Sequence, residues 1–331
     1  VNLFVFVFMI GACLSQGRAQ TKSAVSYKNP VVDIAMPDPT VIKAADGYFY
    51  VYATESTRNV PIMKSKDLVE WTYCNTAFTN KTRPRFEPKA GIWAPDINYI
   101  NGKYVLYYAM SVWGGEQTCG IGVATADSPQ GPFTDHGKMF RSNEIGVQNS
   151  IDPSLLQYEG RNYLVWGSFR GIYVIELTAD GLSIMSGAKK KRIAGTAFEA
   201  VYIDKHGDYY YMFASVGSCC QGVKSTYKVV VGRSKKVWGP YKDKTGKPML
   251  KNGYSLVIGA NDHFVGNGHG SQIIQDVAGQ DWLLYHGFSR STPENGRILL
   301  LDQIKWDQEG WPYVEGGSPS YETQKAPVFN N

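Results

Sequence analysis

The chain is predicted to be an all-β protein, a five-bladed β-propeller, on three observations. A hairpin pattern occurs five times, each copy joining an apolar strand, a turn with Asp, Asn or Gly, and a second strand rich in aromatic and β-branched residues. The copies start at intervals of roughly 45 to 70 residues, enough for a four-stranded sheet with its loops. Tyr, Trp, Phe and Gly are abundant, whereas long windows of Ala, Leu, Glu and Lys are absent.

The central copy, residues 151–168 (IDPSLLQYEGRNYLVWGS), shows the pattern best. Its acid, Asp152, is followed at once by Pro153, which cannot donate a hydrogen bond to a sheet and therefore belongs at the first residue of a strand or on an edge. The acid is thus expected at the rim of a sheet. The polar residues that open the five copies are Asp38, Asp96, Asp152, Glu199 and His269.

In a propeller, the first strand of each repeat lies innermost, next to the central axis. Three acids and a histidine are therefore expected to converge on one end of the axis: Asp38, Asp152, Glu199 and His269. Asp96, in the turn WAPD, fits the pattern least well.

The N-terminal segment 1–19 is predicted to be a signal peptide, because its apolar run is too short to cross a bilayer. Ile10 to Cys13 resembles a bacterial lipobox, in which Cys13 would be lipidated and attach the protein to a membrane; cleavage after Ala19 is the alternative. Residues 20–29 are expected to form a polar linker, and residues 30–331 the propeller domain. The protein is expected to be exported, to the periplasm or the exterior, as a monomer.

Charge and cysteine content exclude two classes of function. The net charge is +5, and the basic run Lys189 to Arg192 is expected to be a solvated turn, so no nucleic acid is expected as a partner. No cysteine or histidine spacing is typical of a zinc site. Cys219 and Cys220 are adjacent and form either a disulfide or two small apolar side chains packed under a loop; a Cys74–Cys119 disulfide has no support in the sequence.

The acids suggest glycoside hydrolysis. This reaction needs one carboxylic acid to protonate the leaving oxygen and a second carboxylate to activate water or attack directly. The proton donor must stay protonated near neutral pH, which burial or a nearby negative charge achieves by raising its pKa. Asp38, Asp152 and Glu199 would supply the base, the modulator and the acid. An isolated Asp before Pro is commonly a turn residue, and the shared position in three repeats is what favours function.

Two tryptophans and the histidine add candidate binding residues. Trp93 and Trp113 flank the second repeat at strand–loop junctions, where an exposed indole can stack on the apolar face of a sugar; the alternative is that either one caps the core. His269 stands between glycines in GNGHGS, which allow close approach to the axis. It is a candidate for binding a metal, touching substrate or orienting an acid.

These residues resemble glycoside hydrolase family 43, and within it the α-L-arabinanases, over nearly all of residues 29–320. The matching motifs are MPDPTVI, GIWAPDINYINGKYVLYY, NSIDPSLL, AFEAVYI, FASVGSCCQGVKSTYKVVVGRS, GNGHGSQII and GWPYVEGG. The resemblance implies an inverting mechanism with Asp38 as general base, Asp152 tuning and orienting the acid, and Glu199 as general acid. It also implies sugar contacts at Trp93 and Trp113.

The resemblance further implies a calcium-type ion on the axis near His269, held largely through water. Two departures from the family pattern bear on which glycosidic linkage is cleaved and on the metal site. Methionine and proline stand before Asp38, where arabinanases often have a histidine next to this acid, and GNGHG replaces the commoner GPGHN.

The function expected from the sequence is hydrolysis of α-1,5-linked L-arabinofuranose chains of arabinan by single displacement, in the manner of an endo-1,5-α-L-arabinanase. An exo-acting α-L-arabinofuranosidase or a β-xylosidase on the same fold is one alternative. A propeller that binds sugar without cleaving it is the other.

Overall fold

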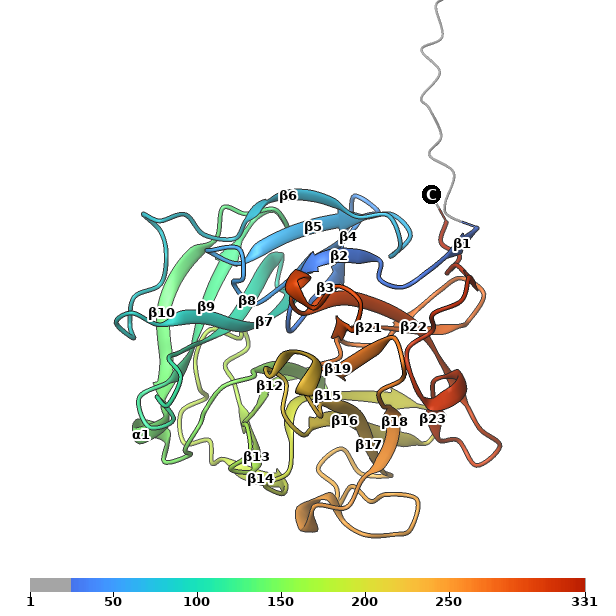
Figure 1. The fold of residues 1–331 in the computed structure, drawn as a ribbon. Coiled ribbons are helices and arrows are strands. Elements are labelled where there is room, and N and C mark those ends of the chain that lie inside the picture. Colours follow the sequence, from blue (N-terminus) through green and yellow to red (C-terminus); the bar gives the residue numbers. More distant parts are fainter. Residues whose placement is uncertain (1–24, 331) are drawn as a thin grey trace, which may run out of the picture.

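The structure, a computed structural model, describes residues 25–330 and consists of five β-sheets arranged in a ring (Figure 1), together with one two-stranded sheet formed near the two ends of the described chain. The predicted five-bladed β-propeller is confirmed. The chain visits the blades in order, and in each blade the strands follow one another as antiparallel neighbours.

Four blades are plain four-stranded meanders. Their strands, from the axis outward, are β3 (Thr40–Lys43), β4 (Phe49–Tyr52), β5 (Pro61–Ser65) and β6 (Thr72–Thr76); β7 (Gly91–Ile100), β8 (Lys103–Ser111), β9 (Gly120–Ala126) and β10 (Thr134–Arg141); β11 (Ser154–Tyr158), β12 (Arg161–Trp166), β13 (Ile172–Glu176) and β14 (Lys191–Ala194); β15 (Glu199–His206), β16 (Tyr209–Val216), β17 (Lys228–Ser234) and β18 (Ser255–Ile258).

The fifth blade closes the ring with both ends of the domain. It contains β19 (Phe264–Gly268), β21 (Asp281–Ser289), β22 (Ile298–Trp306) and, as its outer strand, the N-terminal β2 (Val32–Ala35); β20 (Ile274–Gln275) and β23 (Pro312–Tyr313) pair beside this path. The helical elements are single turns: α1 (Ser142–Ile145), η1 (Gly222–Lys224), η2 (Met249–Lys251), η3 (Pro293–Asn295) and η4 (Glu315–Gly317).

The domain begins earlier than the predicted boundary at residue 30. Ser26 and Tyr27 form β1, which pairs with β24 (Gln324–Lys325). The Tyr27 hydroxyl and the Asn29 side chain each donate to the carbonyl of Leu301, both at 2.9 Å. The last residues of the predicted 20–29 linker are therefore part of the propeller domain, where they bind the strands that close the ring. The predicted signal peptide and Cys13 lie outside the described residues, and none of the helices within 25–330 is long and apolar enough to cross a membrane.

The core lies between neighbouring blades. Because each sheet is covered on both faces, inner strands are continuously apolar rather than alternating; all four residues of β4 are buried, and eight of the nine in β8. Large aromatic side chains fill these layers. Trp166, for example, is fully buried and packs against Phe140 of the preceding blade, with ring centroids 5.2 Å apart.

Each blade has a left-handed non-glycine residue in or beside its innermost strand: before β3 and β11, inside β7 and β15, and directly after β19. These residues define the true equivalence of the repeats. They are Asp38, Ala94, Asp152, Ala200 and His269, with φ between 41° and 56°. Two residues later come Thr40, Asp96, Ser154, Tyr202 and Ser271.

The expectation that Asp96 is equivalent to Asp38 is therefore wrong by two positions. Asp96 lies deeper in the channel, where it accepts hydrogen bonds from the Tyr202 hydroxyl at 2.6 Å and the Leu155 amide at 2.8 Å. Glu199 is offset by one position and, like Trp93, directly precedes the left-handed residue of its strand.

Candidate active site

The left-handed positions gather polar side chains at one end of the axis. Asp38, Asp152 and His269 occupy three of these positions, and Glu199 immediately precedes a fourth. Non-glycine residues with positive φ are costly, and such strain clusters at functional sites. All four side chains belong to buried residues. The backbone thus concentrates three acids and an imidazole in a small volume.

Asp38 is held by cationic and neutral donors. One oxygen, Oδ1, accepts from the Arg297 guanidinium at 2.7 Å, and the other, Oδ2, accepts from the Thr54 hydroxyl at 2.6 Å. His269 Nδ1 lies 3.2 Å from Oδ1. Burial by itself would raise the pKa of Asp38, but Arg297 and His269 together hold it well below its usual range. Asp38 is therefore a carboxylate throughout the neutral range.

His286 orients Asp38 from behind. The Asp38 amide donates to His286 Nδ1 at 3.0 Å, so this nitrogen acts as an acceptor. Burial is the main reason why the pKa of His286 falls to about 4, and the neighbouring Arg297 lowers it further. A neutral imidazole is the form that can accept this bond. His286 also stacks on Tyr227, with ring centroids 5.7 Å apart.

Asp152 and Glu199 form a coupled pair of acids. The Ala200 amide donates to Asp152 Oδ2 at 3.1 Å, which ties Asp152 to the residue after Glu199. Burial, followed by the charge of Glu199, raises the pKa of Asp152. Burial also raises the pKa of Glu199, although the Ser168 and Tyr227 hydroxyls oppose this. Burial and their mutual repulsion thus favour the protonated forms of this pair of acids.

Ser168 fixes the position of Glu199. Its hydroxyl donates to Glu199 Oε2 at 2.6 Å. The Asn149 side chain donates in turn to Ser168 Oγ at 2.9 Å and to the Ser168 carbonyl at 3.1 Å. The NSIDP motif therefore positions Glu199 as well as carrying Asp152.

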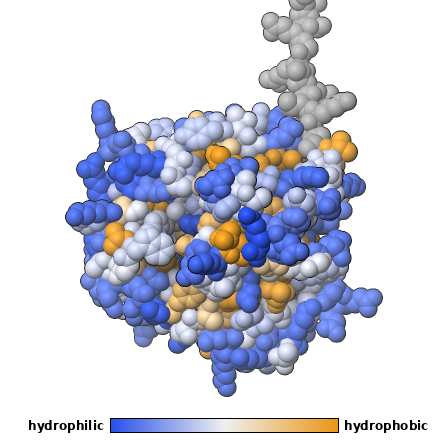
Figure 2. Space-filling view, in the orientation of Figure 1, coloured by the Kyte–Doolittle hydropathy of each residue, from blue (hydrophilic) through white to orange (hydrophobic). Residues whose placement is uncertain are grey.

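The two tryptophans lie together beside the acids. Their ring centroids are 5.4 Å apart. Trp93 is partly buried against a small cluster that includes Ile151, the neighbour of Asp152. Trp113 is 79 % exposed on the loop between β8 and β9. Trp93 therefore combines packing with one open face, and Trp113 does not cap the core. Apolar residues also gather near the centre of the face seen in Figure 2, among hydrophilic ones.

An ion pair joins the Trp113 loop to the next blade. Arg170, two residues after Ser168, donates to both carboxylate oxygens of Glu116, at 2.8 Å and 3.1 Å. Glu116 also accepts from the Gln148 side chain at 2.6 Å. These contacts tie the loop with the exposed indole to the segment that positions Glu199.

The fourth-blade turn after β16 borders the site as well. Cys219 and Cys220 form a disulfide with each other, whereas Cys74 and Cys119 are unbonded. The turn is flanked by Ser215, whose hydroxyl accepts from the His269 amide at 2.8 Å, and by Tyr227, which lies against Glu199. The alternative left open by the sequence is thus resolved in favour of the disulfide.

The residues near His269 bear on metal binding. Within residues 25–330, no three His, Cys, Asp or Glu side chains are grouped so as to hold a metal ion. His269 Nδ1 faces Asp38, which leaves Nε2 as the one imidazole nitrogen available to an ion. A hard cation there would take most of its ligands from water.

Sequence reasoning missed several residues of the site. Arg297 and His286 stand in ordinary strand contexts, ENGRILL and WLLYHGFS, and carry no local signal. A buried carboxylate needs a counter-charge, but sequence does not reveal which of many cations supplies it. The other missed residues, Thr54, Ser168, Ser215 and Tyr227, are small or aromatic strand-end residues, of which Ser215 and Tyr227 lie within the FASVGSCCQGVKSTYK motif.

Comparison with known proteins decides the family. The model of glycosyl hydrolases family 43 matches residues 27–312. The chain belongs to this family. As a family 43 member it is a glycoside hydrolase, and the resemblance noted in its motifs is confirmed.

Individual family 43 proteins cover most of the chain. The extracellular endo-α-(1→5)-L-arabinanase 1 of Bacillus subtilis is 36 % identical over 289 residues, which are 83 % of this chain and 86 % of that protein. The extracellular exo-α-(1→5)-L-arabinofuranosidase of Cellvibrio japonicus is 36 % identical over 306 residues, 84 % of this chain and 86 % of that protein. The α-L-arabinanase of Cellvibrio cellulosa, solved with arabinohexaose, superposes with a TM-score of 0.78 at 33 % identity, covering 88 % of this chain and 99 % of that one.

Proposed function

We propose that this protein hydrolyses the α-1,5-linked L-arabinofuranose chains of arabinan with inversion at the anomeric carbon, cutting within the chain. The observation that carries the proposal is the difference in surroundings between the acids of one site. Asp38 accepts a hydrogen bond from the Arg297 guanidinium, which favours its ionised form, whereas Asp152 and Glu199 are buried beside each other and have raised pKa values. Relatives named as endo-arabinanase and as exo-arabinofuranosidase support the substrate.

In this mechanism Asp38 is the general base. A base must be ionised and anchored so that one oxygen can accept the proton of the attacking water. Arg297 and Thr54 hold the carboxylate in place. Because Arg297 and His269 make Asp38 a weak base in the free enzyme, catalysis requires the water to be aligned by Asp38 and the bound sugar together.

Glu199 is the general acid. It protonates the glycosidic oxygen as the bond to the anomeric carbon breaks, while water attacks the opposite face of the sugar. Asp152 raises the proton affinity of Glu199 by its negative charge, and its bond from the Ala200 amide fixes the two acids relative to each other. A transferred proton leaves Glu199 as a carboxylate that Ser168 stabilises.

The stereochemistry tests this assignment. For inversion, the carboxyls of Asp38 and Glu199 should stand about 6.5–9.5 Å apart, which leaves room for the water. Proton NMR of the first-formed sugar from an arabino-oligosaccharide should show the inverted anomer. Initial retention of configuration would overturn the roles of both residues.

Product analysis tests the mode of cleavage. Chromatography of early products from linear arabinan should show mixed oligosaccharides if the enzyme cuts within the chain. A single small product from the start would instead establish an exo-acting arabinofuranosidase, the alternative that the Cellvibrio japonicus relative favours. Release of xylose from β-xylosides would point to a β-xylosidase, and no release from any glycan would point to a sugar-binding propeller.

The metal and the location belong to the same proposal. For a calcium-type ion, His269 Nε2 and water would be the ligands, and the positive charge of the ion would favour the ionised forms of nearby acids. Export is supported by the extracellular relatives. Membrane attachment through a lipidated Cys13 remains a proposal from the sequence; mass spectrometry of the mature N-terminus tests it.

A further inference from the structure

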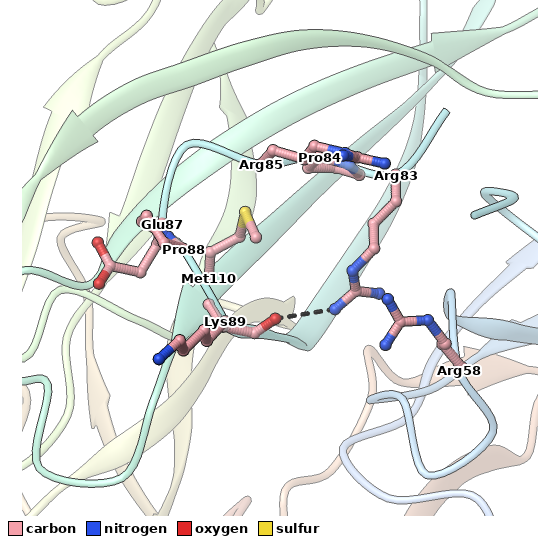
Figure 3. Close-up of a pocket in the computed structure, with 9 residues that line it drawn as sticks. Arg58, Arg83, Pro84, Arg85, Glu87, Pro88, Lys89 and Met110 are labelled. Atoms are coloured by element: carbon pink, nitrogen blue, oxygen red, sulfur yellow. Dashed lines mark hydrogen bonds between the residues drawn. The ribbon is translucent and has the colours of Figure 1, made fainter. Parts of the chain in front are cut away.

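A cavity opens between the first and second blades (Figure 3). Its volume is about 410 Å³, within the roughly 300–1,000 Å³ typical of small-molecule sites. The side chains that line it are mostly cationic or rigid: Arg58, Arg83, Pro84, Arg85, Glu87, Pro88, Lys89, Ala90 and Met110.

Two connections place this cavity at the catalytic end of the propeller. Thr54, which donates to Asp38, is followed directly by Glu55 in the cavity floor. On the other side, Glu87 accepts from the Thr118 hydroxyl at 3.2 Å, and Thr118 belongs to the loop that carries Trp113. Chain neighbours and one hydrogen bond therefore link the cavity lining to the residue that holds Asp38 and to the loop that carries Trp113.

A buried ion pair forms the floor. Arg83 pairs with Glu55 through both guanidinium nitrogens, and both side chains are less than a tenth exposed. Glu55 also accepts from the Asn59 and Ile92 amides at 2.8 Å and 3.0 Å, and Arg83 donates to the Ala90 carbonyl at 2.8 Å. Buried pairs add little net stability but specify geometry when fully hydrogen-bonded. This one fixes the segments that bear the cavity's other cations.

Three of these cations have no acidic partner. Arg58 and Arg85 each hydrogen-bond to neutral atoms of Asn80, both at 3.0 Å. None of the ion pairs within residues 25–330 involves Arg58, Arg85 or Lys89. Glu87, the acid in the lining, is paired with Arg141. The cavity thus carries three uncompensated positive charges over a rigid floor.

We propose that this cavity binds the carboxylate of a uronic-acid residue on an acidic polysaccharide attached to the chain being cut. The proposal rests on the proposed function. Arabinan is uncharged, so it does not account for three unpaired cations around one cavity. A uronate is the sugar whose carboxylate matches the forked donors of Arg58 and Arg85. Lys89 adds a third, more mobile charge.

Direct binding tests the cavity without relying on catalysis. Oligogalacturonate should bind the wild-type protein in low-salt calorimetry, and its affinity should fall as salt rises because the cations are exposed. The variant carrying Arg58→Gln, Arg85→Gln and Lys89→Gln should bind about 10-fold more weakly, because each exposed charge contributes only modestly. Lys189→Gln, Lys190→Gln and Lys191→Gln remove the same charge from the β13–β14 turn and should not weaken binding.

Steady-state kinetics provide a second test of the cavity. The ratio of kcat/KM on uronate-bearing arabinan to kcat/KM on neutral linear arabinan should fall about 10-fold in the cavity variant and stay constant in the turn variant. Circular dichroism shows whether the cavity variant is folded. The single variant Lys89→Gln is a milder change that tests the same ratio if the triple variant does not fold.

Three outcomes would overturn the proposal: no oligogalacturonate binding at low salt, equal binding by the methyl-esterified oligomer, or a site filled by inorganic phosphate but not by uronate. Loss of all hydrolysis of neutral arabinan would instead refute the proposed function, while oligogalacturonate binding still reports on the cavity.

Discussion

The two sides of the catalytic end differ in charge although they are equally buried. Asp38 on one side faces Arg297 and His269, and its pKa lies well below the usual range. On the other side Asp152 and Glu199 face each other and the hydroxyls of Ser168 and Tyr227, and their pKa values are raised. Burial raises the pKa of any carboxyl. The placement of one guanidinium therefore decides which acid is the base.

The cation comes from ring closure. Arg297 precedes β22 of the fifth blade, and its carbonyl accepts from the Met36 amide at 2.9 Å, two residues before Asp38. His286 and His269 belong to the same blade. The first and fifth blades must therefore dock correctly before Asp38 acquires its partners. By contrast, Asp152 and Glu199 belong to consecutive blades and need no such closure.

The largest difference between the two sides of the site is expected when the base and the acid are each replaced by alanine and kcat is compared on two substrates. Asp38→Ala should lower kcat on arabinan by about 10²–10⁴-fold, and by a similar factor on an aryl arabinofuranoside, because the water lacks its base in both reactions. Glu199→Ala should lose as much on arabinan but far less on the aryl substrate, whose leaving group departs without a proton.

Steady-state kinetics on both substrates measure this difference, provided that the wild type accepts the aryl glycoside. Equal losses for Glu199→Ala on both leaving groups would remove its role as proton donor. An Asp38→Ala enzyme that kept its activity on the aryl substrate would remove the role of the base.

Without the Arg297 guanidinium, the pKa of Asp38 should be raised by burial, as the pKa values of Asp152 and Glu199 are. In Arg297→Met the pKa of Asp38 should rise, so the acidic limb of kcat/KM should move to higher pH. The lowered pKa of Asp38 contributes stability above its unfolded pKa of about 3.9 that is lost as pH falls through the folded pKa. Arg297→Met should reduce this contribution at neutral pH, by no more than about 3–5 kcal/mol.

Arg290→Met is the matched control, since it removes an exposed arginine from the same blade. Its pH profile and urea unfolding should follow the wild type. An unchanged acidic limb in Arg297→Met would show that Arg297 does not set the ionisation of Asp38.

Neutralising Asp152 tests the acid side. In the proposed mechanism Asp152 is the ionised member of the pair and favours the protonated form of Glu199, so Asp152→Asn should lower the pKa of Glu199 and move the basic limb of the kcat profile to lower pH. The maximal rate should fall as well, because the Ala200 amide loses its charged acceptor. A lower rate with an unmoved basic limb would reduce Asp152 to a positioning residue.

Metal removal should have the smallest effect. Chelation should lower the Tm of the wild-type protein, because an ion bound to the folded state stabilises it by mass action. Calcium should restore the Tm, and His269→Ala should abolish the difference between chelated and calcium-loaded samples. Differential scanning calorimetry measures both. Identical Tm values with and without calcium in the wild type would eliminate the ion at His269.

Repetition in the sequence was enough to predict the blades and the position of most site residues. Each inner strand has a left-handed residue in it or next to it, and Asp38 and Asp152 could be recognised from their place before proline, and His269 from its glycines. The same reasoning misplaced Asp96, because Ala94 occupies the left-handed position and an alanine gives no polar signal. The left-handed position, rather than the first polar residue, defines which residues are equivalent.

The sequence by itself determined the all-β repeat and the candidate acids, since these depend on local periodicity and turn chemistry. Only the tertiary structure decided which acid is ionised. Arg297 and His286 reach Asp38 from 259 and 248 residues away, and the cation-lined cavity joins segments of two blades. Electrostatic interactions depend on distance in space and on burial, and neither can be read from positions along the chain.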